Sequence, residues 1–312
     1  MVLNKQMLKN SPLKKLYFSK KRYFYHYLNE YTHIGDNFCN IKPKHYFFDI
    51  PYTRWPLYLC VSIAVFAFYF LLSFKKFAFA IPLACIGLFG IIYFAYCWFS
   101  DMVIDSTILG RYNRKVRQSI SYGFMLFLVS EIFCFFGFFW GYFDRLFDPS
   151  VLTGGTALPY GLEPLFKNMK PIYGTVTLIL SGYLANWAVY FTYMGDWVYR
   201  TVCTDLAIIT GYIFLGIQFM EYSNLLFTIS DSVYGSCFYF LTGFHGLHVI
   251  IGLAFLMVQA NRMYFCHPNN IRMQGYRLAL IYWHFVDYIW IFLFISVYVI
   301  NWSSSYYYVW NV

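Results

Sequence analysis

Charge is scarce in this chain. Only 12% of its 312 residues are Asp, Glu, Lys or Arg, whereas 60% are hydrophobic, and the mean hydropathy is +0.51. In an average soluble domain about a quarter of the residues are charged. The composition therefore excludes an ordinary soluble domain and indicates an integral membrane protein.

Paired metal-binding cysteines are also missing. The eight cysteines form no C-x-x-C or C-x-x-x-C pair; they are Cys39, Cys60, Cys85, Cys97, Cys134, Cys203, Cys237 and Cys266. Most lie inside apolar runs. Because a free cysteine behaves as a small hydrophobe, we interpret them as core residues.

Histidine is too scarce for several metal centres. Four of the seven histidines, His26, His33, His45 and His267, lie outside the apolar runs. The remaining three cannot supply the roughly six imidazoles that a haem and a haem–copper pair need. A single bis-histidine haem, with His248 facing His284, stays arithmetically possible.

Seven apolar runs approach the roughly 20 residues that cross a hydrocarbon core of about 30 Å. They cover residues 57–74, 77–99, 120–143, 171–193, 203–222, 232–258 and 278–301. The first two are separated only by Lys75 and Lys76, but together they are too long for one helix. The sequence therefore predicts an all-α integral membrane protein with seven transmembrane helices.

The positions of Lys and Arg predict the orientation. Eighteen fall on the side of the N-terminus and five on the other side. By the positive-inside rule the N-terminus faces the cytoplasm or matrix, and an odd number of spans places the C-terminus opposite.

The N-terminal region is basic. Residues 1–29 hold seven basic residues and no acid, a composition that a mitochondrial presequence would share. Because Met1 is included, we expect a retained arm over 1–56 that contacts partners or anionic headgroups; a disordered basic tail is the alternative. A membrane domain over 57–302 and a C-terminal tail over 303–312 complete the organisation.

One acid lies in the middle of an apolar span. The stretch SYGFMLFLVSEIFCFFGFFWGYFD contains Glu131, and an ionised carboxylate there costs about 2.5–3.5 kcal/mol. Its own helix offers no strong partner, so the partner must come from elsewhere. Two interpretations are open, a proton relay or a neutral acid hydrogen-bonded to a neighbouring helix. On the same span, Gly137 and Gly141 form a G-x-x-x-G suited to an intersubunit or interhelical contact.

Five further polar residues lie in the predicted spans: Glu221, His245, His248, His284 and Asp287. His245 and His248 stand three apart, as do His284 and Asp287, so each pair shares a helix face. Polar contacts between helices are favoured, while haem or copper ligands and a proton or ion path are the alternatives. In the loop 227–236, Ser230 or Asp231 is expected to cap the helix that follows.

Three long blocks resemble subunit III of the haem-copper cytochrome c oxidases. They are FTISDSVYGSCFYFLTGFHGLHVIIG, YWHFVDYIWIFLFISVY and SYGFMLFLVSEIFCFFGFFW. Trp55-Pro56-Leu57 before the first span and Trp98 with Asp101 at the end of the second are similar too. The resemblance covers about residues 50–302.

The resemblance implies a two-helix and a five-helix group around a V-shaped cleft filled by phospholipid. It implies that this chain binds no metal, that haem and copper reside in partner subunits I and II, and that this chain supports subunit I. Glu131 matches an intramembrane glutamate linked to proton uptake. Trp98, Asp105 and Arg262 match positions near bound lipid headgroups.

The chain also departs from the family pattern. Ile104-Asp105 replaces an Arg-Glu pair, and Val189-Tyr190 replaces a His-His pair. Arg277 stands where a glutamate is usual, and Arg272-Met273 replaces a second His-His pair. The lipid assignment is the one that these changes affect most.

The sequence therefore predicts a subunit of a respiratory oxidase that transfers electrons from cytochrome c to oxygen, located in the inner mitochondrial membrane with its N-terminus in the matrix. Accessory subunits are expected at the N-terminal arm. The alternatives are subunit III of a quinol oxidase and a free-standing proton transporter or channel.

Overall fold

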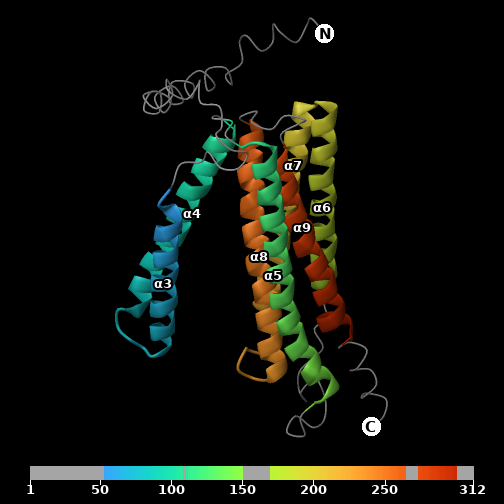
Figure 1. Ribbon diagram of the computed structural model, residues 1–312. Coiled ribbons are helices and arrows are strands. Elements are labelled where there is room, and N and C mark those ends of the chain that lie inside the picture. Colours follow the sequence, from blue (N-terminus) through green and yellow to red (C-terminus); the bar gives the residue numbers. More distant parts are fainter. Residues whose placement is uncertain (1–52, 108–109, 111, 150–168, 265–272, 301–312) are drawn as a thin grey trace, which may run out of the picture. The chain divides into compact units, whose positions relative to one another are not determined.

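The computed structural model describes residues 53–107, 110, 112–149, 169–264 and 273–300. All regular structure in these ranges is helical (Figure 1). The helices are α3 (Trp55–Phe74), α4 (Ala80–Thr107), α5 (Arg114–Phe147), α6 (Lys170–Met194), α7 (Trp197–Tyr222), α8 (Val233–Tyr264) and α9 (Gln274–Leu293), which continues into the π-helix η3 (Phe294–Val299).

The seven predicted spans are confirmed as helices long and apolar enough to cross a membrane. Several are longer than the apolar runs, because a helix continues through the polar headgroup region on either side of the hydrocarbon core. The α4 helix continues past residue 99 through Asp101 and Asp105, and α7 begins at Trp197 rather than at residue 203. The N-terminal arm and the C-terminal tail lie outside the described residues.

The chain divides into two compact units, Met1–Val116 and Arg117–Val312. The first contains α3 and α4, and the second contains nearly all of α5 and the four helices after it. This division confirms the predicted grouping of two and five helices.

Glycines let α3 and α4 approach closely. A Cβ atom on Gly87 would lie 2.7 Å from the backbone nitrogen of Phe66, and one on Gly90 would lie 2.7 Å from the Ser62 hydroxyl. The turn between the helices includes Lys76, whose φ is 56°. Backbone contact at small residues is the usual way for membrane helices to pack.

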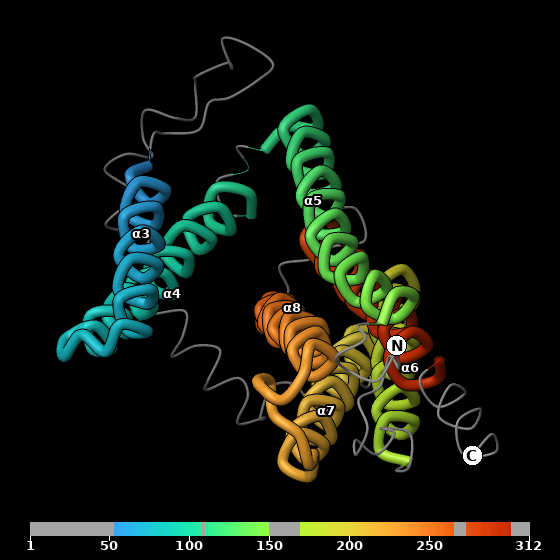
Figure 2. The backbone as a smooth tube through the Cα atoms, turned by 90° about the horizontal axis from the view of Figure 1, so that it is seen from below, coloured from blue at the N-terminus to red at the C-terminus, as the bar shows by residue number. Residues whose placement is uncertain are grey.

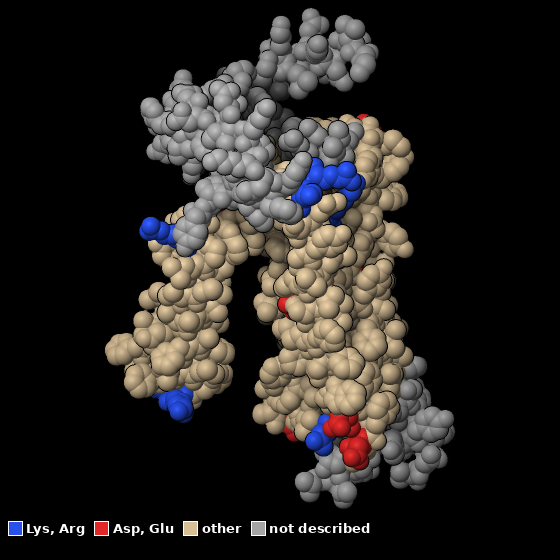
Figure 3. Space-filling view, viewed as in Figure 1, with Lys and Arg blue, Asp and Glu red and all other residues tan. Residues whose placement is uncertain are grey.

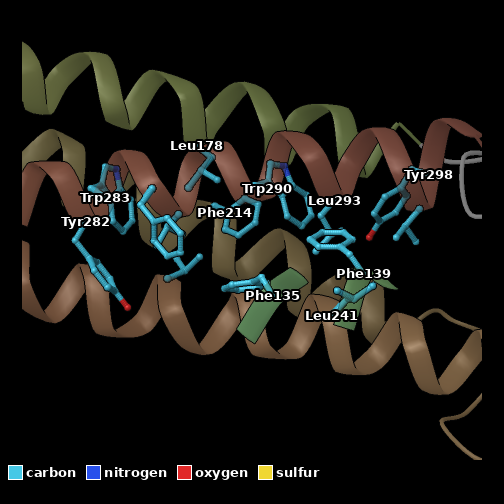
Figure 4. Packing of buried hydrophobic residues seen from close by; sticks show 14 of the residues in the cluster. Phe135, Phe139, Leu178, Phe214, Leu241, Tyr282, Trp283, Trp290, Leu293 and Tyr298 are labelled. Carbon is cyan, nitrogen blue, oxygen red and sulfur yellow. The ribbon is translucent and has the colours of Figure 1, made fainter. Parts of the chain in front are cut away.

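The second unit is a bundle with its own core. Within it α6 packs on α7 and α9, and α8 packs on α7 and α9, as the view along the helices shows (Figure 2). Large rings fill the space between them, among them Phe135, Phe214, Trp283 and Trp290 (Figure 4). The α5 helix contributes to this core through its aromatic side chains.

Trp283 is held by two glycines from different helices. A Cβ atom on Gly211 would lie 3.1 Å from its ring, and one on Gly252 would lie 2.7 Å from it. Its indole nitrogen donates a hydrogen bond of 2.9 Å to the hydroxyl of Ser181, and that of Trp290 donates one of 3.0 Å to Thr175. Inside a membrane such donors need a partner from the protein.

Two predictions about local structure are wrong. Of the six described cysteines only Cys203 is buried, while Cys60, Cys85 and Cys134 are exposed, because an apolar residue of a membrane helix can face lipid as well as the core. The cap of α8 is Ser232, whose hydroxyl accepts a hydrogen bond of 3.0 Å from the amide of Gly235.

Asp231, which the sequence suggested as that cap, instead accepts a hydrogen bond of 2.6 Å from the amide of Thr228 within the loop. Charged residues gather near the ends of the helices in each unit and leave the long stretches between them almost uncharged (Figure 3). This distribution is the one that a hydrocarbon layer around the helices requires.

Candidate functional site

The acid in the middle of α5 has its partner on α8. Oε2 of Glu131 lies 3.0 Å from Nε2 of His248. The His248 side chain is 6% exposed and that of Glu131 is 21% exposed. The expectation that the partner comes from another helix is confirmed.

The second ring nitrogen of His248 fixes the position of one proton. Its Nδ1 lies 2.8 Å from the backbone oxygen of Phe244. A carbonyl oxygen can only accept, so Nδ1 carries a hydrogen and donates it. One further proton must then lie between Nε2 and Glu131, either on the carboxyl group or on the imidazole. The pair is neutral overall in both cases, because it is either two uncharged groups or a cation beside an anion.

Aromatic rings enclose this pair. The His248 ring lies 4.6 Å from that of Phe244 and 5.1 Å from that of Phe135, both at steep angles. The ring of Tyr282 stacks on it at 6.2 Å and 15°. These walls keep water from most of the pair, and low polarity strengthens a hydrogen bond between its members.

His245 lies on the same face of α8 but has a different environment. It is 1% exposed, and its Nε2 lies 3.3 Å from the backbone oxygen of Val286 on α9. Its ring packs 5.0 Å from that of Trp290. This hydrogen bond and the close contact of Gly252 with Trp283 agree with the prediction of a tight polar contact between the helices.

His284 and Asp287 on α9 form a second pair, at the periphery of the bundle. Nδ1 of His284 lies 3.4 Å from Oδ2 of Asp287, and its Nε2 lies 3.1 Å from Oδ1 of Asn186 on α6. Gly182 makes room for this arrangement, because a Cβ atom there would lie 2.6 Å from the Asp287 carboxylate. Asp287 is 7% exposed, whereas the side chain of His284 is 30% exposed.

Glu221 lies at the opposite end of α7 from Trp197 and is buried. Its carboxylate interacts electrostatically with Tyr298 and with Lys170. The Tyr298 hydroxyl makes no hydrogen bond of ordinary geometry. The structure therefore places Glu221 among polar groups of the bundle but apart from the pair of Glu131 and His248.

The three predicted lipid-contact residues belong to different units. Trp98 and Asp105 lie on α4, and Arg262 lies on α8. Trp98 is partly exposed and stacks on Phe99, with 5.9 Å between ring centroids. Asp105 is buried. The pKa of Tyr112 is raised by the burial of Tyr112 itself and by the nearby Asp105 carboxylate.

Sequence reasoning missed some of these partners. Asn186, Ser181 and Gly182 gave no motif of their own, although all three lie on one helix within six residues. Sequence spacing along one helix cannot show which residues of another helix lie opposite. The identity of the Glu131 partner was missed for the same reason.

The geometry does not support a haem between His248 and His284. Both ring nitrogens of His248 already have protein partners, Phe244 and Glu131, and both of His284 lie close to Asn186 and Asp287. Within the described ranges, no three or more His, Cys, Asp or Glu side chains form a group that could hold a metal ion.

Comparisons with known proteins agree on one family. The family model described as "Cytochrome c oxidase subunit III" matches residues 45–304. Proteins named cytochrome c oxidase subunit 3 are similar over most of the chain. The one from Emericella nidulans is 37% identical over 258 residues, which are 82% of this chain and 95% of the relative.

Relatives from a plant and a bird carry the same name. The Arabidopsis thaliana protein is 41% identical over 219 residues, covering 69% of this chain and 82% of the relative. The Coturnix japonica protein is 39% identical over 219 residues, covering 70% and 84%.

Proposed function

The chain belongs to the cytochrome c oxidase subunit III family and is a subunit of complex IV, and on this premise we propose that Glu131 and His248 support proton uptake by the oxidase. The observation that carries this proposal is the 3.0 Å contact between Glu131 and His248. Two titratable groups that share one proton inside a membrane can exchange it at little electrostatic cost, because the net charge of the pair stays the same.

In this proposal the two residues have different tasks. His248 is held by its hydrogen bond to Phe244 and by the rings around it, so it positions the carboxyl group. Glu131 is the more exposed member and is the group that meets protons arriving from a neighbouring subunit. Subunits I and II are proposed to hold the haem and copper that carry out electron transfer to oxygen.

The second part of the proposal concerns phospholipid. The α3 and α4 helices expose large apolar side chains on most of their surface, including Phe68, Phe74 and Phe89. Such surfaces need lipid or protein cover. We propose that phospholipid lies between the two units, with Trp98 and Arg262 near the headgroups. Asp105, being buried, would act on a headgroup only through its neighbours.

The proposed topology places the N-terminus in the matrix of the inner mitochondrial membrane. With seven spans, the beginnings of α3, α5, α7 and α9 share one side. Arg54, Arg114, Lys115, Arg117, Arg200 and Arg277 lie at those ends. This excess of basic charge supports the assignment by the positive-inside rule. The arm over 1–56 would then meet accessory subunits on the matrix side.

Replacement of Glu131 in the assembled oxidase tests the proton role. We expect Glu131→Ala to slow proton uptake and lower the number of protons pumped per electron, with an unchanged haem spectrum, because the metals lie in other subunits. Glu131→Gln is the matched variant, since it keeps the shape and can still hydrogen-bond to His248. Wild-type turnover and pumping in both variants would remove Glu131 from the proton path.

A map of the intact oxidase tests the lipid role. Acyl-chain density between the two-helix and five-helix units is the expected result. A dry boundary filled by side chains would contradict the lipid-filled cleft without affecting the proposed role of Glu131.

A further inference from the structure

A second group of buried polar side chains lies in the five-helix unit, at the end where α7 stops. Gln218 and Glu221 stand three residues apart on α7, so they share a face of the helix, and they are 8% and 7% exposed. Tyr298 of η3 is 1% exposed and is turned into the bundle (Figure 4). An amide, an acid and a phenol therefore occupy one buried region that the pair of Glu131 and His248 does not use.

Two hydrogen-bond donors of this region are left over. Among the described residues, Nε2 of Gln218 and the hydroxyl of Tyr298 are buried and make no hydrogen bond of ordinary geometry. Each still lies beside an acceptor, Gln218 beside the hydroxyl of Tyr222 and Tyr298 beside the carboxylate of Glu221. A buried donor without an acceptor is costly. Polar groups that lie near each other but form no direct bond are commonly joined by water.

The directions of the neighbouring hydrogen bonds define what the leftover amide requires. The Thr242 hydroxyl donates its hydrogen to the backbone oxygen of Phe238 at 2.7 Å. In the 2.5 Å contact between the Tyr222 and Thr242 hydroxyls, Tyr222 is therefore the donor. The oxygen of Tyr222 and the carboxylate of Glu221 can then only accept, whereas Nε2 of Gln218 can only donate. A molecule that joins these groups must accept from one and donate to another, as water does.

The backbone around Tyr298 is a second, independent feature of this region. The chain forms the π-helix η3 over Phe294–Val299, and short π-helical turns are frequent at functional sites. Three consecutive residues of this turn, Ser296, Val297 and Tyr298, are each 1% exposed or less. The backbone oxygen of Ser296 accepts a hydrogen bond of 3.0 Å from the hydroxyl of Tyr142 on α5. The π-turn is thus fixed to a neighbouring helix and holds Tyr298 beside Glu221.

We propose that Gln218, Glu221 and Tyr298 form an internal water-binding site, in which at least one water molecule accepts from the Gln218 amide and donates to a carboxyl oxygen of Glu221. A cation offers no acceptor to the amide, and an anion would lie beside an acid. Buried waters typically make about three hydrogen bonds to otherwise unsatisfied polar groups. Water can reach the site from the adjacent end of the bundle, where the half-buried Lys170 interacts with Glu221.

Hydroxyl-radical labelling of the intact oxidase tests the site, because X-ray pulses convert bound water into radicals that modify the side chains beside it. Tyr276 is the matched control. It is also 1% exposed, but its hydroxyl donates a hydrogen bond of 3.1 Å to the backbone oxygen of Ala185. We expect mass spectrometry to find Tyr298 modified several-fold more than Tyr276. Equal modification of the two tyrosines would overturn the inference, whatever the role of Glu131.

A map of the intact oxidase that shows ordered waters gives a second measurement. We expect a water within about 3.2 Å of the Glu221 carboxylate and of either Gln218 or Tyr298. Direct hydrogen bonds among these side chains, with no water between them, would overturn the site, as would an ion or a lipid headgroup in its place.

The variant Gln218→Met keeps the length of the side chain and removes the donor. We expect a several-fold fall in the labelling of Tyr298 relative to Tyr276 in the assembled oxidase. Unchanged labelling would refute the part assigned to the amide. If this variant does not assemble, the labelling and the map of the wild-type oxidase still decide the question.

Discussion

The two units of this protein are built on different principles. In the spans of α3 and α4, 6% and 17% of the residues are buried. In the second unit the share is 33–44% in the spans of α6 to α9 and 17% in that of α5. The first unit has one helix–helix interface, formed where Gly87 and Gly90 meet α3. The second has a core rich in aromatic side chains, to which all five helices contribute a residue.

This difference shows where each unit obtains its stability. Lipid tails are as apolar as the side chains they touch, so burial alone drives membrane helices together only weakly. Close packing and hydrogen bonds must do so instead. The five-helix unit has both, in the contacts of Trp283 and in the pair of Glu131 and His248. The helix pair has close packing and a strong side-chain hydrogen bond between its helices, from Trp55 to Asp101.

The largest effect is expected from His248→Ala. It leaves Glu131 inside the membrane without its partner and opens a space beside the rings of Phe135 and Phe244. Removing one member of a buried pair typically costs about 3–5 kcal/mol. We expect a large loss of assembled oxidase, measured by native electrophoresis, with the normal haem spectrum in whatever oxidase assembles.

His248→Gln serves as the control, because an amide can still hydrogen-bond to Glu131 and should recover part of the assembly. If the His248→Ala oxidase assembled with all its subunits but lacked a haem band, His248 would have a metal role and the structural interpretation would be wrong.

The next effect is expected from Gly252→Ala in the five-helix unit. The new Cβ atom would lie 2.7 Å from the ring of Trp283, which also packs closely against Gly211. Overpacking of this kind costs about 1–3 kcal/mol. A lower melting temperature of the assembled oxidase is the expected observation. Gly246→Ala is matched to it on the same helix, where no atom lies within 4 Å.

Gly87→Ala tests the same principle in the helix pair. The added methyl group would lie 2.7 Å from the Phe66 backbone, so α3 and α4 must move apart. With one interface to lose, the change should stay local. We expect faster hydrogen exchange in α3 and α4 and unchanged exchange in α6 to α9. Equal acceleration in both units would contradict the separation between them.

The smallest effect is expected from Trp55→Phe. The indole nitrogen donates a 2.6 Å hydrogen bond to Asp101, and the phenyl ring keeps most of the contact with Phe94. The expected cost is about 1 kcal/mol. Hydrogen exchange at the first turn of α3 measures it, with Trp55→Tyr as the comparison.

Much of the fold was predictable because a membrane imposes a simple rule. Every run long and apolar enough to cross it had to be a helix, and all seven are. The failures concern what the two sides of a helix face. Cys134 looked like a core residue, but it is exposed. The Gly137 and Gly141 motif makes no close contact with the described residues of this chain, so its intersubunit contact stays a prediction.

The sequence by itself determined the number of spans, the need of Glu131 for a partner, and the family, because each depends on composition or on long motifs. Only the tertiary structure decided that the partner is His248 and that Asn186 lies against His284. The physical reason is that an apolar run marks a helix that can cross the membrane but does not show which of its sides is buried or which residues of another helix lie at the same depth.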